Sequence, residues 1–266
     1  MAASSLSSNL AFSARVRHAE PVMGTVVSFD VPLSARHDES LDAAISWLHW
    51  VDRIFSPYRP DSDVSGLAEG AVTVDGCAPE MAEVIEACAF LRELSRGYFT
   101  ASPWGRFDPS GYVKGWAVER AADILAAAGS ASHLVNGGGD VQCAGGRPGS
   151  TPAPWRVGIA DPFKRGRLAL VVEARDCGVA TSGTAERGAH IANPRTGCPA
   201  AGLASVTVAG PSLALADAFA TAAFAMGPDL ARDWTESCLD GYEAYAITET
   251  GATWQTSGFA ARIAAI

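Results

Sequence analysis

The 266-residue chain has few positive charges and no apolar run that approaches the length of a membrane span. Lysine and arginine number 20 against 29 aspartates and glutamates, which gives a net charge of −9. This balance argues against nucleic acid or an anionic membrane surface as a partner. The N-terminus has neither a signal-peptide pattern nor a cysteine that could carry a lipid, so we expect a cytoplasmic protein.

The six cysteines form no recognisable motif. They stand at positions 77, 88, 143, 177, 198 and 238, without CxxC spacing and without a nearby histidine to complete a zinc site. The pattern predicts small buried side chains in a reducing compartment. The chain also lacks the GxGxxG and Walker motifs, and Ser182 is not in a GxSxG elbow, which disfavours a hydrolase nucleophile there.

The composition favours a folded chain with a substantial core, since 48% of the residues are hydrophobic and 18% are charged. Helical and strand patterns alternate irregularly, and the strands cluster late. This order predicts an α+β fold with mixed or antiparallel sheets and flanking helices, rather than repeating βαβ units. We expect a flexible Ser/Ala-rich tail over residues 1–18 and one domain over residues 19–266.

Apolar periodicity and turn residues predict the individual elements. We expect a loop at 56–67, which is dense in Pro, Ser and Asp. Helices are expected over 41–55 (capped by Ser40), 80–95, 116–129, 213–226 and 229–238. Strands are expected over 20–32, 133–139, 155–162, 167–174, 177–183, 204–210, 242–249 and 252–258.

The helix expected at 213–226 contains a single charge. Asp217 and Thr221 are four residues apart, which places both oxygens on one face of a helix. An unpaired buried carboxylate is costly, and the helix has no Lys or Arg to pair with it. A hard divalent metal with oxygen ligands, such as Mg²⁺, would satisfy the carboxylate. The alternative is an Asp near a helix N-terminus that the dipole or loop amides stabilise.

Three other segments could carry chemistry. The run Gly137–Gly139 after a strand could bind phosphate or admit a flat ring, or it could be a tight turn. Lys114, between glycines at the start of a helix, could reach a phosphate or carboxylate, or it could be an ordinary solvated lysine. His190 could be a general base, or a strand histidine that a backbone carbonyl satisfies.

Taken in order, seven segments resemble the ApbE-type flavin transferases, the FAD:protein FMN transferase family. They are MGT at 23–25, FSPYRPDSDVSGL at 55–67, GYVKGWAVERA at 111–121, VNGGGDV at 135–141, WRVGIADP at 155–162, VATSGTAERGAHIANPRTG at 179–197 and ADAFATAAFAMG at 216–227. The resemblance implies an α+β domain that binds FAD with Mg²⁺. It further implies transfer of FMN from FAD, through a phosphoester, to a Thr of an acceptor protein, with release of AMP.

The resemblance also implies roles for individual residues. Asp217 and Thr221 would be metal ligands, with the carbonyl of Val113 as a third, and His190 would be the base. The implied FAD pocket contains Met23, Tyr58, Lys114, Gly137, Gly138, Gly139, Asp140, Ser182 and Gly183. The chain departs from the family pattern at two positions, with Asn193 before the Pro-x-Thr-Gly turn and Thr100 after Gly-x-Phe, where the family has Asp.

Two other functions remain open for the same residues. Water in place of the Thr hydroxyl would hydrolyse FAD to FMN and AMP. A flavin-binding protein that stores or senses FAD without turnover is a third possibility, although such a protein has no evident use for a base and a metal at the pyrophosphate. The TGAT sequence at 250–253 is similar to a flavin acceptor motif, but it lacks the upstream Asp, and we interpret it as a hairpin turn.

Overall fold

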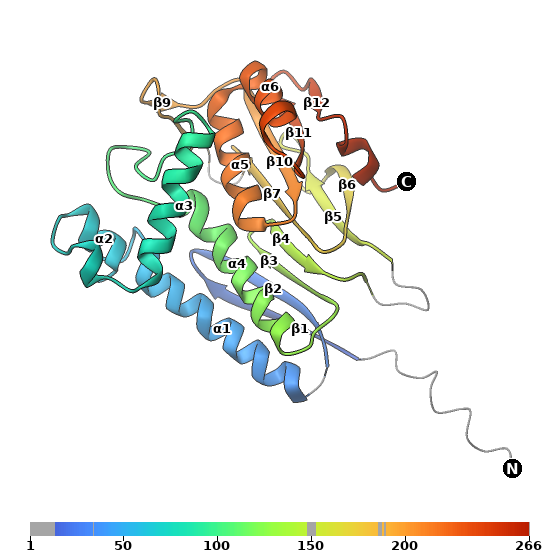
Figure 1. Cartoon of the computed structure of the whole chain (residues 1–266). Coiled ribbons are helices and arrows are strands. Elements are labelled where there is room, and N and C mark those ends of the chain that lie inside the picture. Colours follow the sequence, from blue (N-terminus) through green and yellow to red (C-terminus); the bar gives the residue numbers. More distant parts are fainter. Residues whose placement is uncertain (1–13, 34, 148–152, 186–187, 189, 266) are drawn as a thin grey trace, which may run out of the picture.

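A computed structural model describes residues 14–33, 35–147, 153–185, 188 and 190–265. Its main feature is an eight-stranded sheet in which every neighbouring pair is antiparallel. Helices cover one face, and a two-stranded sheet covers the other (Figure 1). This arrangement confirms the α+β prediction. The strand order is β1 (Arg15–Val22), β2 (Thr25–Pro32), β3 (His133–Gly137), β4 (Asp140–Ala144), β7 (Cys177–Gly183), β10 (Leu203–Gly210), β11 (Glu243–Thr248) and β12 (Thr253–Gln255).

The sheet separates two hydrophobic cores. Val208 of β10 contributes to the core under the helices, whereas its neighbour Ala209 contributes to the core on the other side. The second core is closed by β5 (Trp155–Ala160) and β6 (Leu168–Ala174), which pair with each other. Since successive side chains of a strand point to opposite faces, a strand with both faces covered is apolar along its length. All eight residues of β10 are accordingly buried.

The helices differ from the prediction mainly at their starts. The first begins at Ala35, so Ser40 lies inside it and does not cap it. A short helix also occupies part of the expected loop, because the Ser62 hydroxyl accepts a hydrogen bond from the Ser65 N–H (3.1 Å) and caps it. The helices are α1 (Ala35–Phe55), α2 (Asp63–Ala68), α3 (Glu80–Leu94), α4 (Ser110–Ala127), α5 (Leu213–Met226) and α6 (Pro228–Cys238).

Helix α4 begins at Ser110, six residues before the predicted start at 116. The Asp108 carboxylate accepts a hydrogen bond from the Ser110 N–H (3.0 Å) and so satisfies one amide of the first turn. Lys114 therefore lies inside a helix, one turn after its start. The observed bounds of the other helices and strands are close to the predicted ones, except at the N-terminus.

The strand expected over 20–32 is in fact a hairpin. Met23 and Gly24 have φ values of 55° and 68°, and Val22 pairs with Thr25 across them. Positive φ at both central residues is typical of a type I′ turn, which joins two antiparallel strands. Strand β1 begins at Arg15, so residues 15–18 of the expected tail belong to the sheet. Residues 1–13 of that tail lie outside the described residues.

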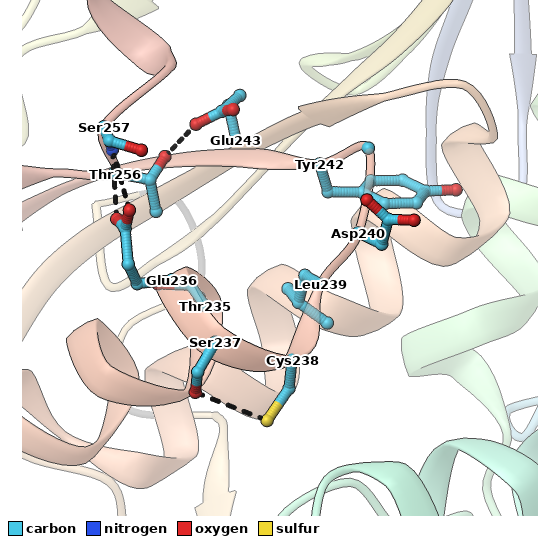
Figure 2. A pocket seen from close by; sticks show the side chains of 11 residues that line it. Thr235, Glu236, Ser237, Cys238, Leu239, Asp240, Tyr242, Glu243, Thr256 and Ser257 are labelled. Atoms are coloured by element: carbon cyan, nitrogen blue, oxygen red, sulfur yellow. Dashed lines mark hydrogen bonds between the residues drawn. The ribbon is translucent and has the colours of Figure 1, made fainter.

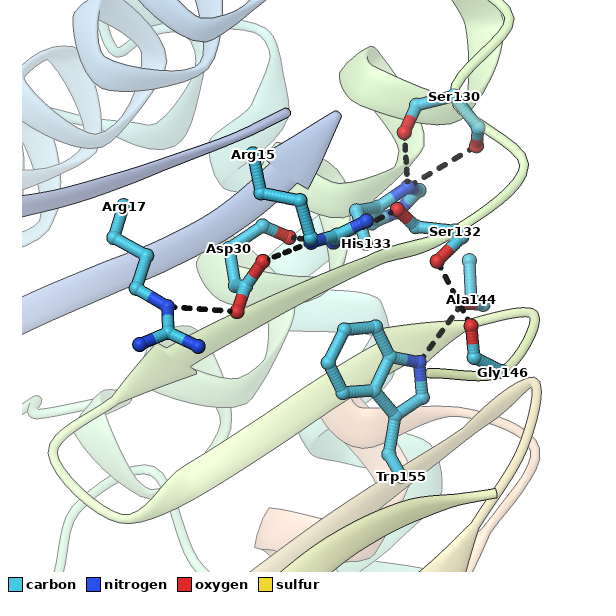
Figure 3. A network of polar contacts seen from close by, with 9 residues as sticks. All are labelled: Arg15, Arg17, Asp30, Ser130, Ser132, His133, Ala144, Gly146 and Trp155. Carbon is cyan, nitrogen blue, oxygen red and sulfur yellow. Dashed lines mark hydrogen bonds and ion pairs between the residues drawn. The ribbon is translucent and has the colours of Figure 1, made fainter. Parts of the chain in front are cut away.

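Arg15 connects β1 to the rest of the sheet (Figure 3). Its side chain forms an ion pair with Asp30 and donates to the carbonyl oxygens of Asp30 (2.9 Å) and Ser132 (3.1 Å). The guanidinium group also lies over the Trp155 ring, 5.4 Å from its centroid. These contacts hold the first strand in place and explain why the sheet begins before residue 19. Within the described ranges, no helix combines the length and apolarity that a membrane crossing needs.

Alkaline unfolding should report on Tyr112 of α4. Burial, assisted by the carboxylates of Glu83 and Glu119, raises the pKa of Tyr112 to about 12. A folded-state pKa above the unfolded value of about 10 contributes stability below pH 10, and that contribution is lost as the pH rises through 12. We expect Tyr112→Phe to lose about 1–2 kcal/mol less stability than wild type across this range, after allowance for solvent screening. Urea unfolding at several pH values measures this, and identical pH dependence in the two proteins would contradict it.

Candidate active site

Two adjacent helices bring a lysine and a buried carboxylate together. Asp217, on α5, is 4% exposed, and its Oδ2 lies 2.9 Å from Lys114 Nζ on α4. The same oxygen accepts a hydrogen bond from the Gly115 N–H (3.0 Å). Lys114 also forms an ion pair with Asp140, which is 2% exposed. The cation that α5 itself lacks is thus supplied by α4, so burial of Asp217 does not by itself require a metal.

Gly115 allows the two helices to approach this closely. A methyl group at this position would lie 2.7 Å from the Leu213 carbonyl oxygen and 2.8 Å from Asp217 Cβ. Both separations are shorter than a van der Waals contact, so a larger residue would force α4 and α5 apart. Figure 1 shows the two helices side by side over the sheet. The glycine therefore sets the distance between Lys114 and Asp217.

Glu119 of α4 satisfies the N-terminus of α5. Its Oε2 accepts hydrogen bonds from the Ala214 N–H and from the Ser212 hydroxyl, both at 2.7 Å. Ser212 is the N-cap, and its hydroxyl oxygen also accepts from the Leu215 N–H (3.3 Å). These amides are satisfied without Asp217, whose carboxylate faces α4. Asp217 therefore does not serve as a cap for its own helix.

Replacing Glu119 with alanine should destabilise the protein by about 1–2 kcal/mol, because a buried helix N-terminus loses its carboxylate acceptor. Urea denaturation monitored by circular dichroism measures the change. Glu86→Ala is the matched control, since Glu86 is an exposed residue in the middle of α3. Equal stability losses in the two variants would contradict the role assigned to Glu119.

The strands below the helices add further oxygen atoms to the cluster. Asp140 Oδ1 accepts a hydrogen bond from the Thr181 N–H (3.0 Å), which fixes the carboxylate between β4 and β7. Ser182 Oγ lies 3.2 Å from Thr221 Oγ1, one helical turn after Asp217 on α5. Gly183, at the end of β7, packs against the neighbouring strand, where a methyl group would lie 2.8 Å from the Ala204 carbonyl oxygen.

The glycine run forms a tight turn between β3 and β4. Gly138 and Gly139 have φ values of 63° and 101°, and Gly137 pairs with Asp140 across them. The Gly139 N–H donates to Asn136 Oδ1 (2.9 Å). A methyl group at Gly138 would lie 2.6 Å from Thr25 Oγ1, so this turn abuts the strand that follows the Met23–Gly24 turn. Two hairpin turns thus meet near Asp140.

A cavity of about 500 Å³ is formed by residues outside the Lys114 cluster. It is bounded by the loop after α3, including the half-exposed Trp104, and by the turn that contains Pro194. Gly111 lies between this loop and α5, since a methyl group there would lie 3.3 Å from the Phe99 ring and 3.5 Å from Thr221 Cγ2. The cavity is lined by Arg92, Gly97, Thr100, Ser102, Pro103, Trp104, Gly105, Pro194 and Gly197.

For three predicted residues, the described contacts lie within their own segment or in the hydrophobic core. Tyr58 is 90% exposed, and its N–H donates a hydrogen bond to Ser56 Oγ (3.3 Å) within the same loop. Val113 belongs to α4, and its side chain is buried in the hydrophobic core. His190 is exposed, with Nδ1 at 3.0 Å from the Gly188 carbonyl oxygen. Because a carbonyl can only accept, Nδ1 is the donor in this contact, which leaves Nε2 as the ring nitrogen that could accept a proton.

A second cavity, of about 310 Å³, contains none of the predicted site residues (Figure 2). Its polar side chains hold the C-terminal segment against α6 and β11. Hydrogen bonds from the Ser257 side chain and from its N–H (3.0 Å) lower the pKa of Glu236. Glu243 accepts from Thr256 and from the Gly258 N–H (3.1 Å). Glu236 and Glu243 in this cavity therefore have a structural role, because they hold the C-terminal segment in place.

Sequence reasoning missed Asp108, Glu119 and Trp104. The Asp-Pro pair at 108–109 is a helix-start signal that could have located the beginning of α4. Glu119 left no such signal, because its partners lie more than ninety residues away on α5. Among the described residues, no group of three or more His, Cys, Asp and Glu could hold a metal ion.

The ApbE family model matches residues 23–103 and 100–246 of this chain. The chain belongs to the ApbE family. Within that family it is 30% identical over 262 residues to an FAD:protein FMN transferase of Rhodobacter capsulatus, a match that covers 93% of this chain and 46% of the relative. It is 31% identical over 159 residues to the protein of the same name from Escherichia coli (strain K12), covering 56% and 44%. The chain thus spans about half the length of the curated relatives that it matches.

Solved structures of the ApbE family share the fold. The apo flavinyl transferase ApbE of Pseudomonas stutzeri superimposes with a TM-score of 0.81 at 23% identity, covering 96% of this chain and 98% of that one. The ApbE protein of Thermotoga maritima gives a TM-score of 0.82 at 23% identity, covering 95% and 100%. This likeness places the α+β fold of the chain among the ApbE structures.

Proposed function

We propose that this chain is a Mg²⁺-dependent FAD:protein FMN transferase, which moves FMN from FAD onto a threonine hydroxyl of an acceptor protein and releases AMP. The observation that carries the proposal is the cluster of Lys114, Asp140 and Asp217, with Thr221 and Ser182 beside it. Membership of the ApbE family and the names of its relatives support the same activity.

The charge and donor types of the cluster fit Mg²⁺. Two buried carboxylates face one ammonium group, so the cluster has an excess negative charge that a further cation would balance. Asp217 and Thr221 would hold the ion, and the carbonyl of Val113 remains a predicted third ligand. Mg²⁺ prefers oxygen ligands and needs only one or two carboxylates when water and substrate phosphates complete its shell.

The reaction needs a base, neutralisation of the pyrophosphate and a leaving group. His190 Nε2 would take the proton of the acceptor threonine while Nδ1–H stays on the Gly188 carbonyl. The threonine oxygen would form a bond to the FMN phosphorus, and the bond from that phosphorus to the oxygen of AMP would break. Bound Mg²⁺ would supply charge stabilisation for the phosphate oxygens. Lys114 would add a second positive charge there.

The 500 Å³ cavity and the two hairpin turns are the surfaces that we propose for the rest of FAD. The 500 Å³ cavity lies in the size range of small-molecule sites, and Trp104 offers an aromatic face for a ring system. The two hairpin turns, at Met23–Gly24 and Gly138–Gly139, present little side-chain bulk and would let a flat ring or phosphate approach. Tyr58 would contact the flavin through its exposed ring.

Incubating the purified protein with FAD, in Mg²⁺ or in EDTA, separates the candidate functions. The transferase requires AMP release that depends on both Mg²⁺ and an added acceptor protein. AMP release that is equally fast without acceptor would favour FAD hydrolysis. FAD that binds equally well in EDTA and stays intact with Mg²⁺ and acceptor would favour a flavin-binding protein and overturn the proposal.

A further inference from the structure

Lys114 occupies the position between two buried carboxylates. The chain has two lysines in all, Lys114 and Lys164. The Lys114 side chain is 26% exposed, whereas those of Asp140 and Asp217 are 2% and 5% exposed. Its ammonium group forms ion pairs with both. Among the residues that the structure describes, the positive charge that pairs with these carboxylates is therefore at the end of a long, flexible side chain with a route to solvent.

We infer that Lys114 competes with the divalent cation for the space between Asp140 and Asp217, and that Asp140 is a second carboxylate ligand of that cation. The inference rests on the proposed function for the identity of the ion, and it adds Asp140 to the ligands and a regulatory role for Lys114. In this arrangement the ammonium group holds the carboxylates in place until the metal arrives.

Two contacts and the flexibility of the lysine side chain support the exchange. Asp140 Oδ1 is fixed by the Thr181 N–H, which leaves Oδ2 directed at Lys114. The Gly115 N–H holds Asp217 Oδ2, so that carboxylate stays in position when the lysine leaves. A lysine has a compact charge on a flexible four-carbon stem, so the side chain can turn outward while its backbone remains in α4. Neither carboxylate has to move.

Competition makes metal binding depend on the nucleotide. Without FAD, a divalent cation must displace an ammonium group from two carboxylates, which weakens its binding. When FAD is present, its phosphates offer the displaced ammonium group a new partner. Metal and FAD should then each strengthen the binding of the other by the same factor.

The test measures Mn²⁺ binding, as a probe for Mg²⁺, to protein without FAD. Electron paramagnetic resonance of free Mn²⁺ gives the dissociation constant. We expect Lys114→Met to bind Mn²⁺ at least tenfold more tightly than wild type, because the competitor is gone. Lys164→Met, in an exposed loop, is the matched control and should bind like wild type. Equal or weaker binding by Lys114→Met would overturn the competition.

Asp140→Asn tests the second ligand in the same assay. We expect at least tenfold weaker Mn²⁺ binding, measured in the Lys114→Met background so that loss of the lysine partner does not mask the effect. Unchanged affinity would remove Asp140 from the ligand set. Neither measurement involves FAD cleavage or an acceptor, so failure of the transferase proposal would leave these results intact, and the reverse also holds.

A measurement on wild type covers the case in which the variants do not fold. With lysine labelled at ¹⁵Nζ, the two lysine side chains give separate signals that NMR follows during a Mg²⁺ titration. The Lys114 signal should shift as the ion displaces it, and the Lys164 signal should stay in place. Saturation with Mg²⁺ that leaves the Lys114 signal unchanged would contradict the inference.

Discussion

Replacing Asp217 with asparagine should reduce Mg²⁺-dependent release of AMP from FAD about a thousandfold. Asparagine has nearly the same shape and can still accept the hydrogen bond from Gly115, but it removes the negative charge that would hold the ion. Loss of about 4 kcal/mol of charge stabilisation in the transition state corresponds to this decrease in rate. AMP release measured over a range of Mg²⁺ concentrations should show lower activity at every concentration.

Asp229→Asn is the matched control for this substitution. Asp229 is an exposed acid in the first turn of α6 and should be replaceable without effect on turnover. Thermal unfolding of both variants separates a loss of folding from a loss of activity, because Asp217 also pairs with Lys114. A folded Asp217→Asn protein with wild-type activity at limiting Mg²⁺ would remove Asp217 from the metal site.

Replacing His190 with glutamine should slow transfer to the acceptor by about 10²- to 10⁴-fold, the usual contribution of a general base. Binding of FAD should remain close to wild type, because the ring is exposed and its recorded hydrogen bonds stay within its own segment. Single-turnover labelling of the acceptor gives the transfer rate, and fluorescence titration gives the affinity for FAD.

His49→Gln is the corresponding control, since His49 lies on α1 and contacts Glu20. It should transfer flavin at the wild-type rate. If His190→Gln also does so, another group must take the proton from the threonine. If instead the variant loses FAD binding with unchanged single-turnover rate, His190 is a binding residue.

The sequence predicted the elements whose patterns are local. Helix α5 is apolar, begins after Ser212 and ends at Gly227, so its bounds could be read from residues within it. The start of α4 was missed because Gly111 and Gly115 lower helix propensity over its first turns, although the Asp108–Pro109 pair marks it. The reason for Gly115 is tertiary, since it lets α5 approach. The N-terminal hairpin was missed because Met23, which takes positive φ there, is not a turn residue.

For the candidate site, too, the local features could be predicted and the contacts between distant segments could not. The i, i+4 spacing of Asp217 and Thr221 placed both on one face, and the ordered motifs of the ApbE family identified the other segments. The spacing could not reveal that Lys114 would supply the cation, because it lies about a hundred residues earlier on another helix. The role of Glu119 was invisible for the same reason. Pairing between distant helices depends on packing that a single sequence does not display.

Covalent labelling of an acceptor protein tests the central claim most directly. Wild-type protein, FAD and Mg²⁺ would be incubated with an acceptor that has a single candidate threonine, and with its Thr→Val variant. Intact-mass spectrometry of the acceptor and quantification of AMP would follow. The proposed function predicts addition of one FMN to the threonine acceptor, an equal amount of AMP, and neither product with the valine variant. Equal AMP release with both acceptors and no mass change in either would contradict transfer and leave hydrolysis as the activity.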